Sequence, residues 1–225
     1  MRTKRGVMAK RFELIVFDWD GTLMDSAAAI VASIQAAAAD LGLSPPREDR
    51  ARHVIGLGLH EALHYVLPEL EASRHRQMAE RYRHHYLSHD KDLKLFDGAE
   101  WLVQGLATAG HMLAVATGKS RAGLDRALAA SGLAARFDAT RCADECHSKP
   151  HPQMLEELME ELGVPPSLTL MIGDTTHDLE MARNAGVSAL GVSYGAHPRE
   201  ALESTTPLRC VDSMAELSAW LRQHA

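Results

Sequence analysis

The chain has 225 residues, of which 46% are hydrophobic, and its formal net charge is −6 at pH 7. This length and apolar content suffice for a globular core with a smaller inserted domain, and the negative charge does not favour binding to a nucleic acid backbone. No apolar stretch is long enough to span a membrane, so we expect neither nucleic acid nor a membrane as a partner.

The first ten residues are basic, and no apolar segment of the kind found in secretory signals follows them. We therefore expect residues 1–10 to be a flexible tail. The chain contains three cysteines, and their spacing does not match a disulfide framework. This favours free thiols and a cytoplasmic location, where thiols stay reduced.

The first predicted strand, Phe12–Phe17, is followed directly by the sequence Asp18-Trp19-Asp20-Gly21-Thr22. In an extended chain, Asp18 and Asp20 point to the same side, whereas Trp19 points to the other and is expected to pack in the interior. Two like charges so close together are unfavourable unless a cation lies between them. The pair therefore indicates a functional site.

A long interval without a convincing strand follows, from Met24 to Asp92. Helices are predicted over Ala27–Leu41, Glu61–Leu67 and Ser73–Ser88. This pattern predicts a small helical domain, residues 24–92, inserted after the first strand. Gly56 and Gly58 lie in a turn between its helices, where glycine permits a close approach of the backbone to another group.

Beyond residue 92, short apolar runs alternate with helical stretches. Strands are predicted at Met112–Ala116, Leu168–Ile172 and Ala189–Val192, and helices at Gly98–Ala109, Arg121–Ser131, Gln153–Leu162 and Asp178–Ala185. Glycines follow these helices at the positions of left-handed caps, namely Gly110, Gly132, Gly163 and Gly186. The alternation predicts an α/β fold with a Rossmann-like parallel sheet, formed by residues 11–23 and 93–225.

Three polar segments lie at the ends of these elements: two follow a predicted strand, and one precedes the predicted helix at Gln153. They are Thr117-Gly118-Lys119-Ser120, Ser148-Lys149-Pro150 and Gly173-Asp174-Thr175-Thr176-His177-Asp178. Ligands of open parallel sheets bind beyond the carboxyl ends of the strands. We therefore expect these segments and the Asp18 loop to meet at one edge of the sheet.

Four motifs, D-W-D-G-T, A-T-G, S-K-P and G-D-T-x-x-D, occur in this order along nearly the whole chain. Together they resemble the haloacid dehalogenase superfamily, and within it the phosphoglycolate-phosphatase-like branch. The resemblance implies a helical cap over the core. It also implies Mg²⁺-dependent hydrolysis of a small phosphorylated metabolite, a phosphate monoester, through an aspartyl phosphate.

The resemblance also assigns roles to the acidic residues. Asp18 matches the nucleophile and Asp20 the general acid and base. The Mg²⁺ ligands would be the carboxylates of Asp18 and Asp174 and the main-chain carbonyl of Asp20. Asp178 would bind the metal directly or through water, although an acid at the start of a helix is also favoured by the helix dipole.

The other motif positions are expected to contact the substrate. Thr117 matches a hydroxyl that binds the transferring phosphoryl group, and Lys149 matches the lysine that neutralises charge around the nucleophile. Gly118 stands where the family commonly has Asn, and its N–H remains available to the substrate. Gly56 would belong to a cap loop that selects the substrate. Lys119 matches no catalytic position and is interpreted as a surface lysine.

Three alternatives stay open. A phosphomutase of the β-phosphoglucomutase type shares both aspartates and the cap but returns the phosphoryl group to a sugar. A haloacid dehalogenase uses a single aspartate without metal, which Asp20 argues against. A non-catalytic phosphate-binding protein would retain the fold alone. Cys142, Cys146 and the nearby His147 do not have the spacing of a standard zinc site. The motifs identify neither the ester nor the oligomeric state.

Overall fold

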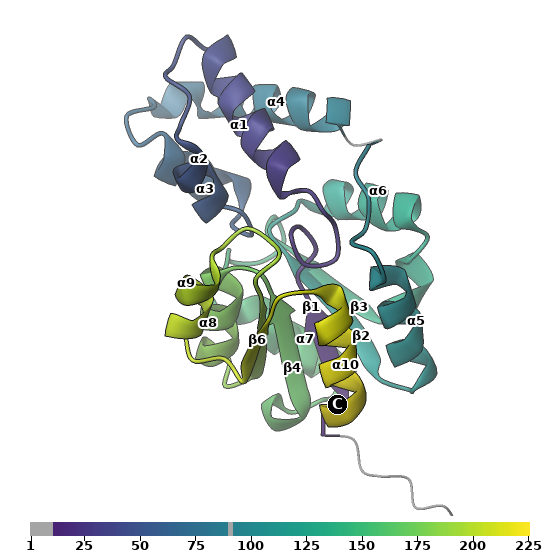
Figure 1. The fold of residues 1–225 in the computed structure, drawn as a ribbon. Helices are drawn as coiled ribbons and strands as arrows, with labels where there is room; N and C mark the ends of the chain where they lie inside the picture. The colour runs from purple at the N-terminus through teal and green to yellow at the C-terminus, as the bar shows by residue number, and fades with distance from the viewer. Residues whose placement is uncertain (1–10, 90–91) are drawn as a thin grey trace, which may run out of the picture.

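The computed structural model describes residues 11–89 and 92–225, so the predicted tail at residues 1–10 lies outside the described residues. Within them, the core is a parallel sheet with the strand order β3-β2-β1-β4-β5-β6 (Figure 1). The strands are β1 (Leu14–Phe17), β2 (Met112–Thr117), β3 (Ala139–Cys142), β4 (Thr169–Gly173), β5 (Ser188–Val192) and β6 (Arg209–Val211). The predicted α/β fold with a parallel sheet is confirmed.

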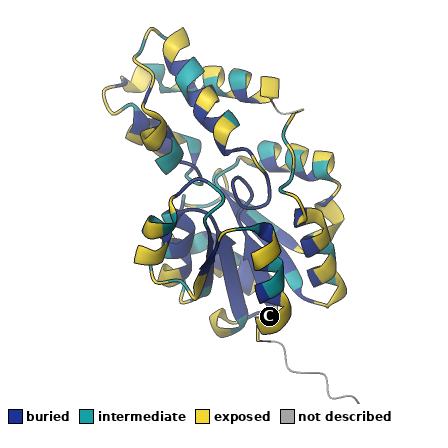
Figure 2. Ribbon diagram, viewed as in Figure 1, coloured by how far each residue is buried: buried dark blue, intermediate teal, exposed yellow. Residues whose placement is uncertain are grey.

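Both faces of the sheet are covered by helices, because alternate residues of each strand point to opposite faces. Ile15 and Phe17 pack in one apolar cluster with side chains from α5 (Ala99–Thr108), α6 (Arg121–Ser131) and α10 (Met214–His224). Leu14 and Val16 pack in another with α7 (Gln153–Leu162), α8 (Thr176–Asn184) and α9 (Arg199–Ser204). The strands are accordingly buried along nearly their whole length (Figure 2).

The remaining helices form a separate group with an apolar cluster of their own. They are α1 (Ala27–Asp40), α2 (Glu48–His53), α3 (Leu59–Val66) and α4 (Ala72–His89). In this group α1 packs on α2 and α4, and α3 packs on α4. Figure 1 shows the four helices together on one side of the molecule, beyond one end of the strands. No helix among the described residues is long and apolar enough to cross a bilayer.

Several elements differ from the sequence prediction. Strands β3 and β6 were not predicted, because they are the two edge strands and expose polar side chains such as Arg209. Helix α2, with the sequence EDRARH, buries only Ala51 and therefore shows no apolar periodicity. Short 3-10 helices at Ala134–Arg136 and Pro166–Leu168, and helices α9 and α10, were also not predicted.

The glycines expected to end helices have the predicted conformation. Gly110, Gly132, Gly163 and Gly186 have φ angles of +84°, +70°, +69° and +68°. Gly132 and Gly163 are the C-cap residues of α6 and α7. The ends of α6 and α7 therefore lie where predicted, in the segments that lead to β3 and β4.

Candidate active site

The three loops that carry the first, second and fourth motifs leave neighbouring strands. Phe17 of β1 lies beside Val115 of β2 and beside Ile172 of β4. The Asp18 N–H donates to the Ile172 carbonyl at 2.9 Å, which holds the start of the first loop against β4. The parallel register therefore brings Asp18, Thr117 and Asp174 to the same edge of the sheet, as predicted.

Three carboxylates meet at this edge. Asp18, Asp174 and Asp178 are completely buried, and each offers an oxygen within 4.8 Å of those of the other two. Burial raises the pKa of Asp18 to about 7, with smaller contributions from the charges of Asp178 and Asp20, while Lys149 lowers it. Burial and the neighbouring Asp18 likewise raise the pKa of Asp174 well above its ordinary range. The cluster is thus unfavourable in its ionised form without a cation.

The hydrogen bonds within the cluster leave the oxygens of one residue open. Asp174 accepts from the Thr22 hydroxyl at 2.8 Å and from the Ala196 N–H at 2.7 Å. By contrast, neither carboxylate oxygen of Asp18 has a hydrogen-bond partner among the described residues. Buried carboxylate oxygens without donors, grouped within reach of one another, fit a divalent cation that prefers oxygen ligands, such as Mg²⁺.

Lys149 joins two of the carboxylates. Its Nζ atom donates to Asp178 Oδ1 at 2.6 Å and lies 2.8 Å from Asp18 Oδ1, a distance that makes an ion pair without the angles of a hydrogen bond. Burial alone would lower the pKa of Lys149, but the charges of Asp178 and Asp18 raise it overall. The lysine is therefore a fixed, buried cation that holds Asp18 in place.

Asp178 also has the role expected of an acid at the start of a helix. Its Oδ2 atom accepts from the N–H and the hydroxyl of Thr175, while the Asp178 N–H donates to that hydroxyl, which completes a capping box at the start of α8. The two interpretations offered for Asp178 are therefore compatible. Its side chain caps the helix and stands in the acidic cluster at once.

Two glycines make room for Asp174. A Cβ atom at Gly21 would lie 2.1 Å from Asp174 Oδ2, and one at Gly195 would lie 2.3 Å from the same atom. Any other residue at these positions would displace the carboxylate. Gly21 also has a φ of +78°, which favours glycine on its own account.

The glycine turn of the helical group reaches into the site. A Cβ atom at Gly118 would lie 2.5 Å from the carbonyl oxygens of both Gly56 and Leu57, and one at Gly56 would lie 3.3 Å from Thr175 Oγ1. The Gly58 N–H donates to the Ser148 hydroxyl at 2.8 Å. The departure from the common family residue at position 118 thus has a structural reason, since a larger side chain would collide with this turn.

Asp20 has two polar partners, and one of them was misinterpreted from the sequence. The Ser26 hydroxyl donates to Asp20 Oδ1 at 2.6 Å, and Lys119 Nζ lies 3.1 Å from Asp20 Oδ2. Lys119 also donates to the Tyr86 hydroxyl of α4 at 2.8 Å, and its side chain is only 10% exposed. The interpretation of Lys119 as a surface lysine is therefore wrong.

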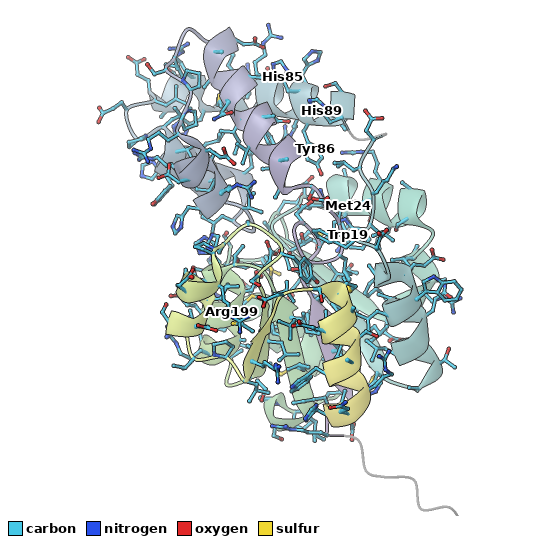
Figure 3. All side chains as sticks on the ribbon, viewed as in Figure 1. Trp19, Met24, His85, Tyr86, His89 and Arg199 are labelled. Atoms are coloured by element: carbon cyan, nitrogen blue, oxygen red, sulfur yellow. The ribbon has the colours of Figure 1, made fainter. Side chains whose placement is uncertain are left out.

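Figure 3 shows Tyr86 between α4 and the loop that carries Trp19 and Met24. The Lys119 contact therefore joins the helical group to the core beside Asp20. Its position two residues after Thr117 was a usable signal, because that loop starts at the sheet edge. Trp19 is fully buried and packs edge-on against Phe137, as expected. Thr117 is also fully buried, and its hydroxyl oxygen accepts from the Lys119 N–H at 3.3 Å.

A cluster of three histidines beside the site was not predicted. His177 Nε2 and His197 Nε2 lie 2.7 and 3.1 Å from the carbonyl oxygen of His53, at the end of α2. The Thr176 N–H donates to His197 Nδ1, so the proton of this ring is on Nε2 and points to the His53 carbonyl. The ring nitrogens lie within 4.8 Å of one another.

The Nε2 atoms of His177 and His197 donate to the His53 carbonyl, so these contacts hold the end of α2 against the start of α8. Burial lowers the pKa of His177 and lowers that of His197 to about 4, which keeps both rings neutral. His53 precedes His177 by 124 residues in the sequence, so no motif spacing relates the three histidines.

The cysteines lie elsewhere. Cys142 ends β3 and is buried, and Cys146 Sγ lies 3.6 Å from Glu157 Oε2. Burial raises the pKa of the Cys142 thiol to about 12 and that of Cys146 to about 11, so both thiols are protonated and unreactive at neutral pH.

Comparisons with known proteins agree with this geometry. The family model described as haloacid dehalogenase-like hydrolase matches residues 15–192. A Dickeya dadantii protein named "Probable phosphatase IndB" is 39% identical over 215 residues, which cover 91% of each chain. The N-acetylmuramic acid 6-phosphate phosphatase of Pseudomonas aeruginosa is 33% identical, over 84% of this chain and 86% of its own.

The fold also matches that of solved structures. A hydrolase from Pseudomonas syringae superimposes with a TM-score of 0.87 over 95% of this chain and 99% of its own, at 23% identity. At that identity the likeness concerns the arrangement of the elements. It covers both the sheet and the helical group whose Tyr86 contacts Lys119.

Proposed function

The chain belongs to the haloacid dehalogenase-like hydrolase family and is a phosphatase, and on this premise we propose that it hydrolyses a small phosphate monoester with Mg²⁺ through an aspartyl phosphate on Asp18. The observation that carries the proposal is the buried cluster of Asp18, Asp174 and Asp178, in which the Asp18 oxygens lack hydrogen-bond donors among the described residues. Oδ2 is available to phosphorus or to a metal ion, while Oδ1 also lies 2.8 Å from Lys149 Nζ.

The donor set fits Mg²⁺, which binds oxygen ligands. Asp18 and Asp174 would bind it through their carboxylates and Asp20 through its main-chain carbonyl, with Asp178 close enough for contact directly or through water. When bound, the ion would offset the negative charge of the substrate phosphate.

In the first step, an oxygen of Asp18 attacks phosphorus. The bond between phosphorus and the ester oxygen breaks, and Asp20 gives its proton to the departing oxygen. In the second step, Asp20 takes a proton from water as the water oxygen attacks phosphorus, which releases inorganic phosphate and restores Asp18. Ser26 and Lys119 hold one carboxylate oxygen of Asp20 each and so fix the orientation of its side chain.

The phosphoryl group would be held by three neighbours. The Thr117 hydroxyl can donate to it, because its oxygen already accepts from a backbone N–H. The Gly118 N–H, in the loop that precedes α6, would add a second donor. Lys149 keeps Asp18 oriented for attack and balances the charge of the acidic cluster.

We further propose that residues 24–92 act as a cap, and that residues 11–23 and 93–225 are the catalytic core. The contacts of the Gly56 turn with position 118, and of Tyr86 with Lys119, support this division. Closure of such a cap would exclude bulk water during transfer and let Gly56 and its neighbours select the substrate. We propose a cytoplasmic protein acting on a phosphorylated metabolite, in keeping with its free thiols.

The test is phosphate release from a panel of phosphate monoesters, measured with Mg²⁺ and with EDTA. The proposal expects turnover only with Mg²⁺ and none in Asp18→Asn. Activity that is indifferent to EDTA, or an Asp18→Asn variant with near wild-type turnover, would overturn it. Formation of an isomerised sugar phosphate without free phosphate would indicate a mutase instead. Absence of any magnesium-dependent reaction with every ester tested would indicate a phosphate-binding protein.

A further inference from the structure

A cavity of about 370 Å³ opens beside Asp20, between the helical group and the core. Asp20, Gly118 and Lys119 line it on the core side, and the Gly56 turn borders it. The proposed general acid must contact the ester oxygen of the substrate, so the organic part of the substrate extends from Asp20 into this space. The volume falls within the range of pockets that enclose small organic molecules, about 300–1,000 Å³.

The cap side of the cavity is mostly apolar. Ile30 and Ile34 of α1, Leu63 of α3 and the rings of Tyr82 and Tyr86 of α4 line it. The two tyrosine rings are stacked, with centroids 5.9 Å apart and an angle of 28° between their planes. Together the two rings form an aromatic wall on α4, and the Tyr86 hydroxyl contacts Lys119 of the catalytic loop. Aromatic and aliphatic walls of this kind favour a ring-bearing, largely apolar group.

The charges near Asp20 do not suit a second anionic group. Lys119 is the cation nearest to Asp20 in this cavity, and it is already paired with Asp20 and with the Tyr86 hydroxyl, its Nζ atom lying 4.7 Å from the centroid of the Tyr86 ring. The other basic residues of the lining, His60, Arg83 and Arg126, are exposed to solvent. A substrate with a second anionic group, such as a short carboxylic acid or a second phosphate, would place that group against apolar side chains and the Asp20 carboxylate.

We propose that the natural substrate is the phosphate monoester of a ring-bearing alcohol whose organic group is largely apolar, and that this group packs against Tyr82, Tyr86 and Leu63. The inference rests on the proposed function, because it assigns the leaving group of the same reaction. Tyr82 and Leu63 are specificity-determining residues in this view, and neither takes part in the chemistry at Asp18.

The test compares phosphonates, which keep the phosphate-like group but cannot be hydrolysed. Dissociation constants of benzylphosphonate, methylphosphonate and phosphonoacetate are measured by calorimetry with Mg²⁺. One methylene in an apolar pocket changes affinity by roughly 10-fold or more, so benzylphosphonate should bind at least about 10-fold more tightly than methylphosphonate. Equal affinities, or tighter binding of phosphonoacetate, would overturn the inference.

Three variants locate the binding of the ring. Tyr82→Ala removes one of the two rings of the aromatic wall and should sharply reduce the advantage of benzylphosphonate while methylphosphonate binds as before. Tyr82→Phe retains the ring, and Arg81→Ala alters the neighbouring exposed position on α4, so both should bind like the wild type. An advantage that persists in Tyr82→Ala would contradict the assignment of this wall.

The proposed function is tested separately by phosphate release from p-nitrophenyl phosphate. This ester has an activated leaving group that needs little help from the cavity. Absence of its turnover would remove the proposed function whichever phosphonate binds. If p-nitrophenyl phosphate is turned over but benzylphosphonate and methylphosphonate bind equally well, only the assignment of the substrate class is overturned.

Discussion

Replacing Asp18 with Asn should stabilise the metal-free protein at alkaline pH. Asp18 is completely buried, and burial raises its pKa from 3.8 to about 7. Between pH 3.8 and about 7 the folded protein therefore holds a proton at Asp18 that the unfolded chain releases. The stability that this proton contributes is lost as the pH rises through this range and stays lost above pH 7. Asn stays neutral at every pH and suffers no such loss.

The size of the effect follows from the two pKa values. One pKa unit corresponds to about 1.4 kcal/mol, so the rise from 3.8 to about 7 corresponds to about 4 kcal/mol at pH 8. At pH 5 the folded wild type is mostly protonated at Asp18, and the advantage of Asn falls to below about 2 kcal/mol. Lys149 keeps its hydrogen bond to Asp178 in the variant.

Urea unfolding in EDTA at pH 8 and pH 5 measures this difference. Asp25→Asn, at an exposed position of the same loop, is the matched control and should change stability by less than about 0.5 kcal/mol. Mg²⁺ at 100 times its dissociation constant should then stabilise the wild type by about 2.7 kcal/mol but not Asp18→Asn. A variant that is less stable than the wild type at pH 8, or that keeps the full Mg²⁺ effect, would refute the reasoning.

Three further predictions concern the surroundings of the acidic cluster. Asp20→Asn should lower kcat for alkyl phosphates by about 10²–10⁴-fold, because proton transfer to the departing oxygen is lost; a smaller loss in steady-state assays would contradict its assignment. Lys119→Met should lower kcat by about 10–100-fold, the cost of losing the charged partner of Asp20, and change KM less, because Lys119 positions Asp20; a change in KM alone would argue for a role in binding. Burial lowers the pKa of His197 from 6.5 to about 4, so the unfolded chain binds the extra proton and stability falls as the pH drops below 6.5. His197→Asn should therefore remove about 2 kcal/mol of the stability change between pH 7 and pH 5, which urea unfolding of both proteins with Mg²⁺ would detect; identical pH dependence would count against it.

The parts of the site that sequence predicts are those fixed by the parallel sheet. Asp18 and Asp174 come directly after a buried strand and Thr117 ends one, and neighbouring parallel strands end at one edge. The order of the strands therefore places these residues together once the strands are recognised. Asp178 follows Asp174 by one turn of helix, so its position follows from the same register.

The parts that sequence did not predict depend on contacts between distant segments. Lys119 appears as an ordinary loop lysine until Tyr86 and Asp20 are placed on either side of it. The contact of His53 with His177 and His197 depends on how α2 lies against the core, which no periodicity encodes. The edge strand β6 has three residues, of which Arg209 is exposed, so its apolar pattern is too short to identify.

The most direct test of the account uses Asp20→Asn with p-nitrophenyl phosphate and Mg²⁺. The nitrophenolate leaves without a proton, so phosphoryl transfer to Asp18 should stay fast, whereas hydrolysis of the aspartyl phosphate lacks its base and should be slow. The account predicts a burst of one nitrophenolate per active site and, after acid quenching and peptide mass spectrometry, a phosphoryl group on the peptide that contains Asp18. A burst-free reaction with an unmodified Asp18 peptide, or a phosphoryl group on another residue, would contradict it.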